Sequence, residues 1–223
     1  MDNKSFDLII FDCDGVLVDS ELLASQVLSE ELEKNDVDVG PRECRERFTG
    51  SSLKRVKELV FQSTGIELPD DFEDQVRKRD RHVFEERLAP VSGIEEALEL
   101  INTPVCVASS GSLEKITHSL KLAKIYDHFA PNLFSSEMVN RGKPAPDLFL
   151  YAAEQMGVAP ERCLVVEDSP VGIKGAQKAG MAVFGFAGAS HAGPGYAEML
   201  DLTGAPIVFR EMFMLPNLIN FHK

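Results

Sequence analysis

The sequence lacks any apolar run that approaches the ~20 residues needed to cross a bilayer. Its N-terminus, MDNKSFDLII, has no basic leader ahead of a long apolar stretch, so it does not resemble a signal peptide. Cysteine is also scarce, and no Cys-x-x-Cys spacing occurs among Cys13, Cys44, Cys106 and Cys163. Because three of these cysteines lie inside apolar runs, we predict reduced core thiols and a cytoplasmic protein rather than a disulfide or zinc site.

Positive charge is in deficit, with 23 Lys and Arg against 36 Asp and Glu and a formal net charge of −13. This balance argues against non-specific binding of nucleic acid and against docking to anionic membranes. A small anionic substrate remains compatible, because a few local cations and a metal can outweigh the distant field. We therefore expect a small-molecule partner, no nucleic acid and no membrane. Nothing in the sequence favours a dimer, so we expect a monomer.

Five short runs rich in Val, Ile, Phe and Leu show no alternation of apolar and polar residues. Such runs are typical of strands buried on both faces in a parallel sheet covered by helices. They are FDLIIFD (6–12), PVCVASS (104–110), PNLFSS (131–136), RCLVVED (162–168) and MAVFGFAG (181–188). Helical stretches lie between them, with predicted starts at Ser92 and at Ser169. The alternation predicts an α/β fold with a doubly wound, Rossmann-like parallel sheet.

One region interrupts the alternation of strands and helices. From about Ser20 to Leu88 the pattern is helical and charged, and Leu53, Val56 and Val60 form one apolar stripe. We predict an all-helical cap domain of residues 20–88, inserted after the first strand. The core domain then comprises residues 1–19 and 89–223, with hinges at GVLVDS and LAPVSG.

Polar side chains stand where the predicted strands end, and ligands bind at this carboxyl edge of a parallel sheet. With a lysine from the loop RGKPAPD, they are Asp12, Asp14, Ser109, Ser110, Lys143, Glu167 and Asp168. Carboxylates gathered in one place either share protons or bind a cation. Mg²⁺ takes oxygen ligands and is typically held by one or two carboxylates plus substrate phosphate. The sequence therefore predicts a bound Mg²⁺.

Four segments resemble, in order, the four motifs of the haloacid dehalogenase superfamily. They are DCDGVLVDSE (12–21), VASSGS (107–112), GKPAPDLFL (142–150) and VVEDSPVGIKGAQKAGM (165–181). The resemblance extends from Phe6 to about Gly188. The helical insertion is similar to the α-helical cap of the sugar-phosphatase and β-phosphoglucomutase-like branch of that superfamily.

This resemblance implies a covalent route of phosphate ester hydrolysis. Asp12 would be the nucleophile that forms an aspartyl-phosphate. Asp14 would protonate the leaving oxygen and later deprotonate the attacking water, and its backbone carbonyl would ligate Mg²⁺. Ser109 would hold a phosphate oxygen, helped by the backbone N–H groups of Ser110 and Gly111.

The remaining motif residues would neutralise the phosphate or bind the metal ion. Lys143 would neutralise the phosphate and steady Asp12. Asp12 and Asp168 would be direct ligands of Mg²⁺, and Glu167 would contact it either directly or through a water molecule.

The second acid discriminates among the reactions of the superfamily. Dehalogenase and phosphonate-cleaving relatives typically have no acid at the position of Asp14, which therefore favours phosphoryl transfer to or from oxygen. β-Phosphoglucomutases carry a cap His and a cap Arg that grips a second phosphate, and the matching positions here are Ala24 and Leu53. We expect a phosphatase for a small phosphorylated metabolite, a sugar or sugar-acid phosphate. A mutase remains an alternative, since Lys54 or Arg55 can replace that Arg.

Substrate choice is expected to rest with the cap, because the core grips only the phosphate common to all substrates. Ser51, Ser52 and Lys54 are the candidate specificity residues, although the cations here also fit a solvated helix face. His191 follows the last strand-like run and could reach the site, but a lone loop His is more often without function. We interpret Asp19 as the cap of the first inserted helix.

A non-enzymatic alternative is a receiver-type module that accepts a phosphoryl group on Asp and signals to a partner. Such a module needs neither a general acid nor a cap, so Asp14 and the insertion count against it.

Overall fold

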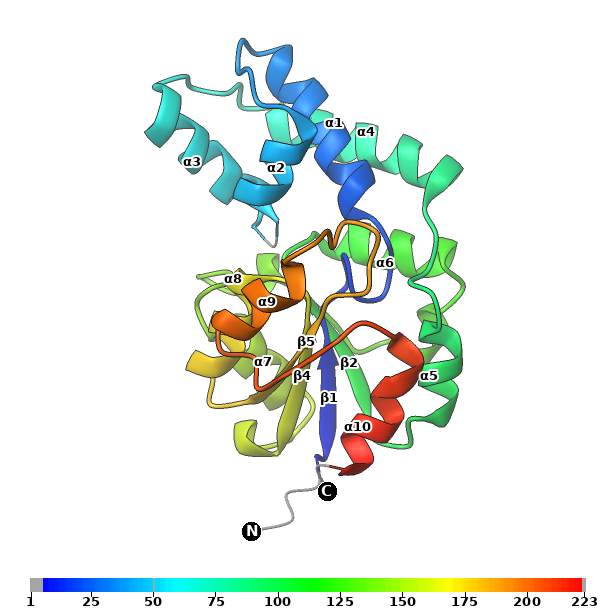
Figure 1. Cartoon of the computed structure of the whole chain (residues 1–223). Coiled ribbons are helices and arrows are strands. Elements are labelled where there is room, and N and C mark those ends of the chain that lie inside the picture. The colour runs from blue at the N-terminus through cyan, green and yellow to red at the C-terminus, as the bar shows by residue number, and fades with distance from the viewer. Residues whose placement is uncertain (1–5, 50, 222–223) are drawn as a thin grey trace.

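The computed structural model describes residues 6–49 and 51–221, and places a helical lobe above an α/β lobe (Figure 1). The described part of the chain contains a six-stranded parallel sheet in the order β3-β2-β1-β4-β5-β6. The strands are β1 (Leu8–Phe11), β2 (Val105–Ser109), β3 (Leu133–Ser135), β4 (Cys163–Glu167), β5 (Ala182–Phe186) and β6 (Ile207–Phe209). The predicted α/β fold and its five strands are confirmed. The edge strand β6 was missed because it is only three residues long and mostly half-buried.

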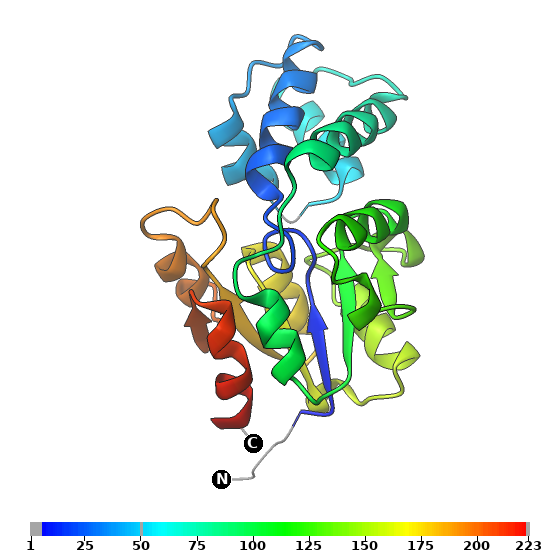
Figure 2. The same cartoon turned by 90° about the vertical axis from the view of Figure 1, so that its right-hand side faces the viewer.

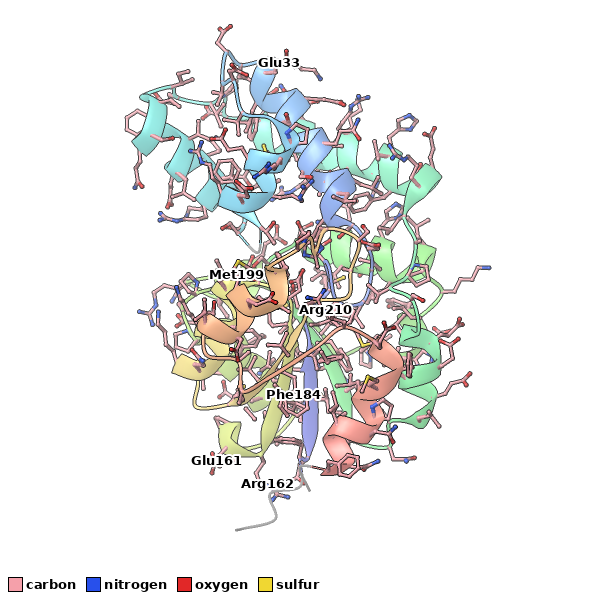
Figure 3. All side chains as sticks on the ribbon, in the orientation of Figure 1. Glu33, Glu161, Arg162, Phe184, Met199 and Arg210 are labelled. Atoms are coloured by element: carbon pink, nitrogen blue, oxygen red, sulfur yellow. The ribbon has the colours of Figure 1, made fainter. Side chains whose placement is uncertain are left out.

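The strands run toward the helical lobe. Arg162, just before β4, binds Asp7, just before β1, and Figure 3 shows Arg162 at the end of the core farthest from Glu33 at the tip of the helical lobe. In Figure 2 the arrow of β1 points up at that lobe. The carboxyl edge of the sheet therefore faces the inserted helices.

Side chains along β1 alternate between two hydrophobic cores. Ile9 and Phe11 enter one core, Leu8 and Ile10 enter the other, and all four are fully buried. The first core is covered by α5 (Ile94–Leu100), α6 (Leu113–Leu122) and α10 (Leu215–Phe221). The second is covered by α7 (Asp147–Gln155), α8 (Pro170–Lys178) and α9 (Tyr196–Leu202). Burial on both faces explains why the runs lack alternation.

The helical lobe has a hydrophobic core of its own, which includes Leu32, Val60 and Phe72. Its helices are α1 (Glu21–Glu33), α2 (Pro41–Phe48), α3 (Leu53–Thr64) and α4 (Phe72–Arg87). The two chain crossings between the lobes run side by side, since Val18 forms a bridge with Pro90. On these grounds we propose the cap domain at residues 20–88.

The helix starts test three capping predictions. Ser169 is confirmed as the cap of α8, because its side chain accepts a hydrogen bond from the backbone N–H of Gly172. The prediction for Ser92 is wrong, since Gly93, at φ +81°, precedes α5 and starts it one residue later. Asp19 does not cap α1 either, because its carboxylate accepts hydrogen bonds from the backbone and hydroxyl of Ser190.

The thiol prediction is confirmed, since all four cysteines are free and buried. Across the described ranges, we find no helix whose length and apolar character suit a membrane crossing.

Candidate active site

Three carboxylates converge where β1 and β4 lie next to each other. Asp12 directly follows β1, Glu167 ends β4, and Asp168 comes next. The strand order of the sheet reverses direction between β1 and β4, and ligands of parallel α/β sheets bind at such a point. All three side chains are buried, and one ligand oxygen from each lies within 4.8 Å of the others. Since parallel strands end at one edge, neighbouring strands bring together acids that are far apart in sequence.

Lys143 lies among these acids. Its ammonium donates hydrogen bonds to Oδ1 of Asp12, at 2.8 Å, and to Oε1 of Glu167, at 2.5 Å, and its side chain is almost fully buried. Burial lowers the pKa of Lys143, but the two carboxylates outweigh burial and raise the pKa above its usual value. For Asp12, burial raises the pKa well above its usual range, and Lys143 opposes that rise. One ammonium against three acids leaves the cluster short of positive charge.

The geometry of the cluster fits a divalent cation. Oδ2 of Asp168 is buried and has no hydrogen-bond partner among the described residues. Gly15, at φ +76°, wraps the β1 loop so closely that a Cβ there would lie 1.9 Å from that oxygen. Both oxygens of Glu167 already accept hydrogen bonds, from Lys143 and from Ser169. Asp12 and Asp168 therefore suit direct ligation, and Glu167 suits contact through water.

Asp14 is held from two sides at the mouth of the cluster. The hydroxyl of Ser20 donates to Oδ1, at 2.6 Å, and the ammonium of Lys115 donates to Oδ2, at 2.9 Å. Burial acts to raise the pKa of Asp14, but Lys115 and Ser20 outweigh it and lower the pKa below its usual value. Lys115, in the first turn of α6, was not predicted, because no motif marks it.

The last residue of β2 and the first residue of the loop that follows are the two predicted phosphate-binding serines. Ser109 is buried, and its hydroxyl accepts a hydrogen bond from the backbone N–H of Gly111. The carbonyl of Ser110 accepts a hydrogen bond from Ser136, and the carbonyl of Gly111 accepts one from Ser135. The neighbouring segment at β3 thereby fixes this loop beside Asp12.

A cavity of about 430 Å³ lies between the two lobes and is lined by Asp12 and Asp14 at its floor. The three candidate specificity residues, Ser51, Ser52 and Lys54, all line it from the cap. Ser52 also caps α3. Arg55 pairs with Glu58 instead, and Gly50 lies outside the described residues.

Arg45 and Arg77 line the same cavity, although sequence reasoning did not identify them. Arg77 is held by Glu73 and Glu137. Arg45 is half-buried and, within residues 6–49 and 51–221, no carboxylate lies within ion-pair distance of its guanidinium. An unpaired Arg in a cavity of an acidic protein points to an anionic group of a ligand.

His191 reaches the carboxylate cluster, which is the less favoured of its two sequence interpretations. Its Nε2 lies 3.2 Å from Oδ2 of Asp168 and 3.1 Å from the hydroxyl of Tyr196. Tyr196 in turn donates to the backbone carbonyl of Asp168. Burial lowers the pKa of His191. The signal available in the sequence was its place after β5, whose carboxyl end faces the site.

Comparisons with known proteins agree with this geometry. A family model described as haloacid dehalogenase-like hydrolase matches residues 6–180. The chain therefore belongs to the haloacid dehalogenase-like hydrolases, and the family and the curated relatives identify it as a phosphatase of that type. This finding counts against the receiver-type alternative.

Among curated proteins, the chain is 33% identical over 187 residues to the 6-phosphogluconate phosphatase of Escherichia coli, a match covering 83% of this chain and 85% of the relative. It is 27% identical to the phosphorylated carbohydrates phosphatase of Thermotoga maritima, covering 78% and 81%. Among solved structures, a haloacid dehalogenase-like protein of unknown function from Agrobacterium tumefaciens is 40% identical, with a TM-score of 0.83 and coverage of 97% and 99%.

Proposed function

We propose that the protein is a Mg²⁺-dependent phosphatase that hydrolyses the phosphate ester of a sugar or sugar acid through an aspartyl-phosphate on Asp12. The observation that carries this proposal is that Asp12, hydrogen-bonded to Lys143, and Asp14 lie at the floor of one cavity. The cap side of that cavity carries hydroxyls and cations that have no ion-pair partner among the described residues. Relatives named for 6-phosphogluconate and phosphorylated carbohydrates support the substrate class.

In the first step, an oxygen of Asp12 attacks phosphorus while the bond from phosphorus to the ester oxygen breaks. Asp14 gives its proton to the departing alcohol. Lys115 and Ser20 favour the ionised form of Asp14, and the incoming phosphate dianion opposes them, because a nearby negative charge raises a carboxyl pKa. In the second step, the oxygen of a water molecule attacks phosphorus while Asp14 takes a proton from that water. The bond from phosphorus to Asp12 breaks, which releases phosphate and restores the carboxylate of Asp12.

The charges around the phosphate have separate sources. Ser109 and the loop N–H groups would hold its oxygens, and Lys143 would neutralise part of its charge. Mg²⁺, when bound by Asp12, Asp168, the carbonyl of Asp14 and, through water, Glu167, supplies positive charge that stabilises the transferring phosphoryl group.

The test is a screen for phosphate release, using purified protein with Mg²⁺ and monophosphates of hexoses, pentoses, hexitols, sugar acids and nucleosides. We expect the highest kcat/KM with a sugar or sugar-acid phosphate. The Asp12→Asn variant should release no phosphate from any ester, whereas Asp7→Asn, at an exposed surface ion pair, should retain full activity. Activity retained in Asp12→Asn would exclude Asp12 as nucleophile.

The same screen separates hydrolysis from the mutase alternative. Arg45 and Lys54 are the cap cations placed to hold a second phosphate, as a mutase requires. Isomerised sugar phosphate that forms faster than free phosphate would establish the mutase instead.

A further inference from the structure

Asp80 presents a buried carboxylate oxygen without a protein partner. It lies on α4 of the cap, is 7% exposed, and its Oδ1 has no hydrogen-bond partner in the described part of the chain. A buried polar atom left unpaired is destabilising, so its presence calls for an explanation. Because Asp80 lines the cavity between the lobes, a ligand bound there would supply the missing partner.

Lys115 of the core lies close to Asp80, and their opposite charges attract. Its ammonium lies 5.4 Å from the ring centre of Phe84, and its hydrogen bond to Asp14 uses one of its three N–H donors. Among the described residues no other acceptor bonds that ammonium, so it keeps donors for a ligand. Asp80 and Lys115 thus offer an acceptor and a donor side by side.

Asp80 and Lys115 lie between two neighbouring cavities and line both of them. With Arg77 and Ser112 they line both the main cavity of about 430 Å³ and a neighbouring cavity of about 290 Å³. The alcohol part of a phosphate ester bound at Asp12 would extend from Asp14 into this space. Since Lys115 hydrogen-bonds Asp14 and also interacts with Asp80, the part of the alcohol nearest to the ester oxygen is the part nearest to this pair.

We propose that Asp80 and Lys115 bind a hydroxyl on the carbon next to the phosphorylated carbon of the substrate. The carboxylate of Asp80 accepts a hydrogen bond from that hydroxyl, and the ammonium of Lys115 donates one to the hydroxyl oxygen. This subsite rests on the proposed function, because Asp14 marks where the ester oxygen leaves. It selects vicinal hydroxy phosphates, such as polyol, sugar-acid and open-chain sugar phosphates, over deoxy analogues, which leave both protein groups unpaired.

The ionisation of Asp80 is compatible with this role. Burial raises the pKa of Asp80 to about 7, with Lys115 opposing the rise and Asp14 adding to it. Both the ionised and the neutral carboxyl accept a hydrogen bond, so the subsite operates on either side of neutrality.

The experiment uses two esters that differ by one hydroxyl, glycerol 3-phosphate and 1,3-propanediol phosphate. For the wild type we expect kcat/KM to favour glycerol 3-phosphate by about 10- to 100-fold, the usual effect of a hydrogen bond to a charged group. Asp80→Leu should lower this ratio to within about threefold of one. Glu86→Gln, an exposed acid on the same helix, should keep the wild-type ratio.

Two outcomes would overturn the subsite. An unchanged ratio of the two kcat/KM values in Asp80→Leu would show that Asp80 does not bind the hydroxyl. An equal loss for both esters would mean that Asp80 only supports Lys115 and Asp14. Thermal unfolding completes the test, because an apolar side chain in place of an unpaired buried acid should leave Tm unchanged or higher. If Asp80→Leu does not fold, Asp80→Asn replaces it, with a reduced ratio expected.

Failure of the proposed function would look different. In that case the wild type would release phosphate from no ester in the screen. Calorimetric Kd values for the same two esters, measured with wild type and Asp80→Leu, would still decide whether the hydroxyl is bound. Equal Kd values for the two esters in the wild type would overturn the subsite.

Discussion

The ammonium of Lys143 lies 2.8 Å from Oδ1 of Asp12, and the same ammonium hydrogen-bonds Glu167 at the end of the neighbouring strand. One buried cation thus joins the ends of β1 and β4, which are adjacent in the sheet. This contact orients the nucleophilic carboxylate and offsets part of its repulsion with Glu167 and Asp168. It also makes the stability of the site depend on a single side chain.

Replacing Lys143 with Met should destabilise the fold. Removal of one partner from a buried ion pair leaves uncompensated charge and typically lowers the free energy of unfolding by about 3–5 kcal/mol. Urea unfolding of metal-free Lys143→Met measures this loss. The control is Lys174→Met on the exposed side of α8, which should change stability by less than about 0.5 kcal/mol. Equal midpoints for the two variants would contradict the structural role.

The site residues at the ends of strands could be predicted from the sequence, whereas the site residues on the faces of helices could not. Asp12, Ser109 and Asp168 each follow a recognisable buried run, and the convergence of parallel strands at one edge places them together. That geometry depends only on local patterns and on sheet topology, both of which leave signals in the sequence.

Lys115 and Asp80 lie beyond that reasoning, and His191 lies at its limit. Lys115 and Asp80 meet because α4 of the cap packs on α6 of the core, a tertiary contact that no local pattern encodes. His191 reaches Asp168 through the fold of a loop, which carries no periodicity. The interpretations of Asp19 and Ser92 as helix caps failed for a related reason, since tertiary hydrogen bonding and a left-handed glycine overrode the local capping pattern.

Asp14→Asn should reduce turnover according to the leaving group. A positioned proton donor contributes roughly 10²–10⁴-fold, so kcat on sugar phosphates should fall by that factor. p-Nitrophenyl phosphate has a leaving group that needs no proton, and its kcat should fall much less. Steady-state kinetics on both esters measures the difference. Equal losses would exclude the acid role of Asp14.

Mg²⁺ should bind the wild type and fail to bind Asp168→Asn. Binding at 100 times Kd adds about 2.7 kcal/mol to the free energy of unfolding, so Tm should rise with Mg²⁺ and fall back with a chelator. Calorimetric titration gives Kd directly. Asp201→Asn, on the exposed side of α9, serves as control and should bind like the wild type. A normal Kd in Asp168→Asn would exclude Asp168 as a ligand.

The pH dependence of stability should report the buried acid of the cap. Burial raises the pKa of Asp80 to about 7 in the folded protein, whereas an Asp in the unfolded chain keeps its ordinary pKa of 3.8. Between these values the folded state binds more protons, so the free energy of unfolding falls as pH rises, by up to about 1.4 kcal/mol per unit. Lys115 and Asp14 are the charged groups that most affect Asp80.

Asp80→Asn should remove the contribution of Asp80 to this slope. Its free energy of unfolding, relative to the wild type, should increase from pH 4 to pH 7 and level off above. Urea unfolding at unit pH intervals measures the difference, and Glu86→Gln should run parallel to the wild type. Parallel curves for Asp80→Asn would mean that Asp80 titrates as an ordinary carboxyl.

Arg45 should decide whether an acidic substrate is preferred over a neutral one. Its guanidinium lines the cavity without an ion-pair partner among the described residues, so a carboxylate at the far end of a sugar-acid phosphate would gain a charge-assisted contact. Arg45→Gln should raise KM for a sugar-acid phosphate by roughly 10- to 100-fold and for a hexitol phosphate by less than threefold. Arg42→Gln, on the same helix but paired with Glu46 at the surface, should change neither value. Equal changes in KM for both substrates would show that Arg45 shapes the cavity without binding the carboxylate of the sugar acid. Any preference for the acidic substrate would then have to come from Lys54.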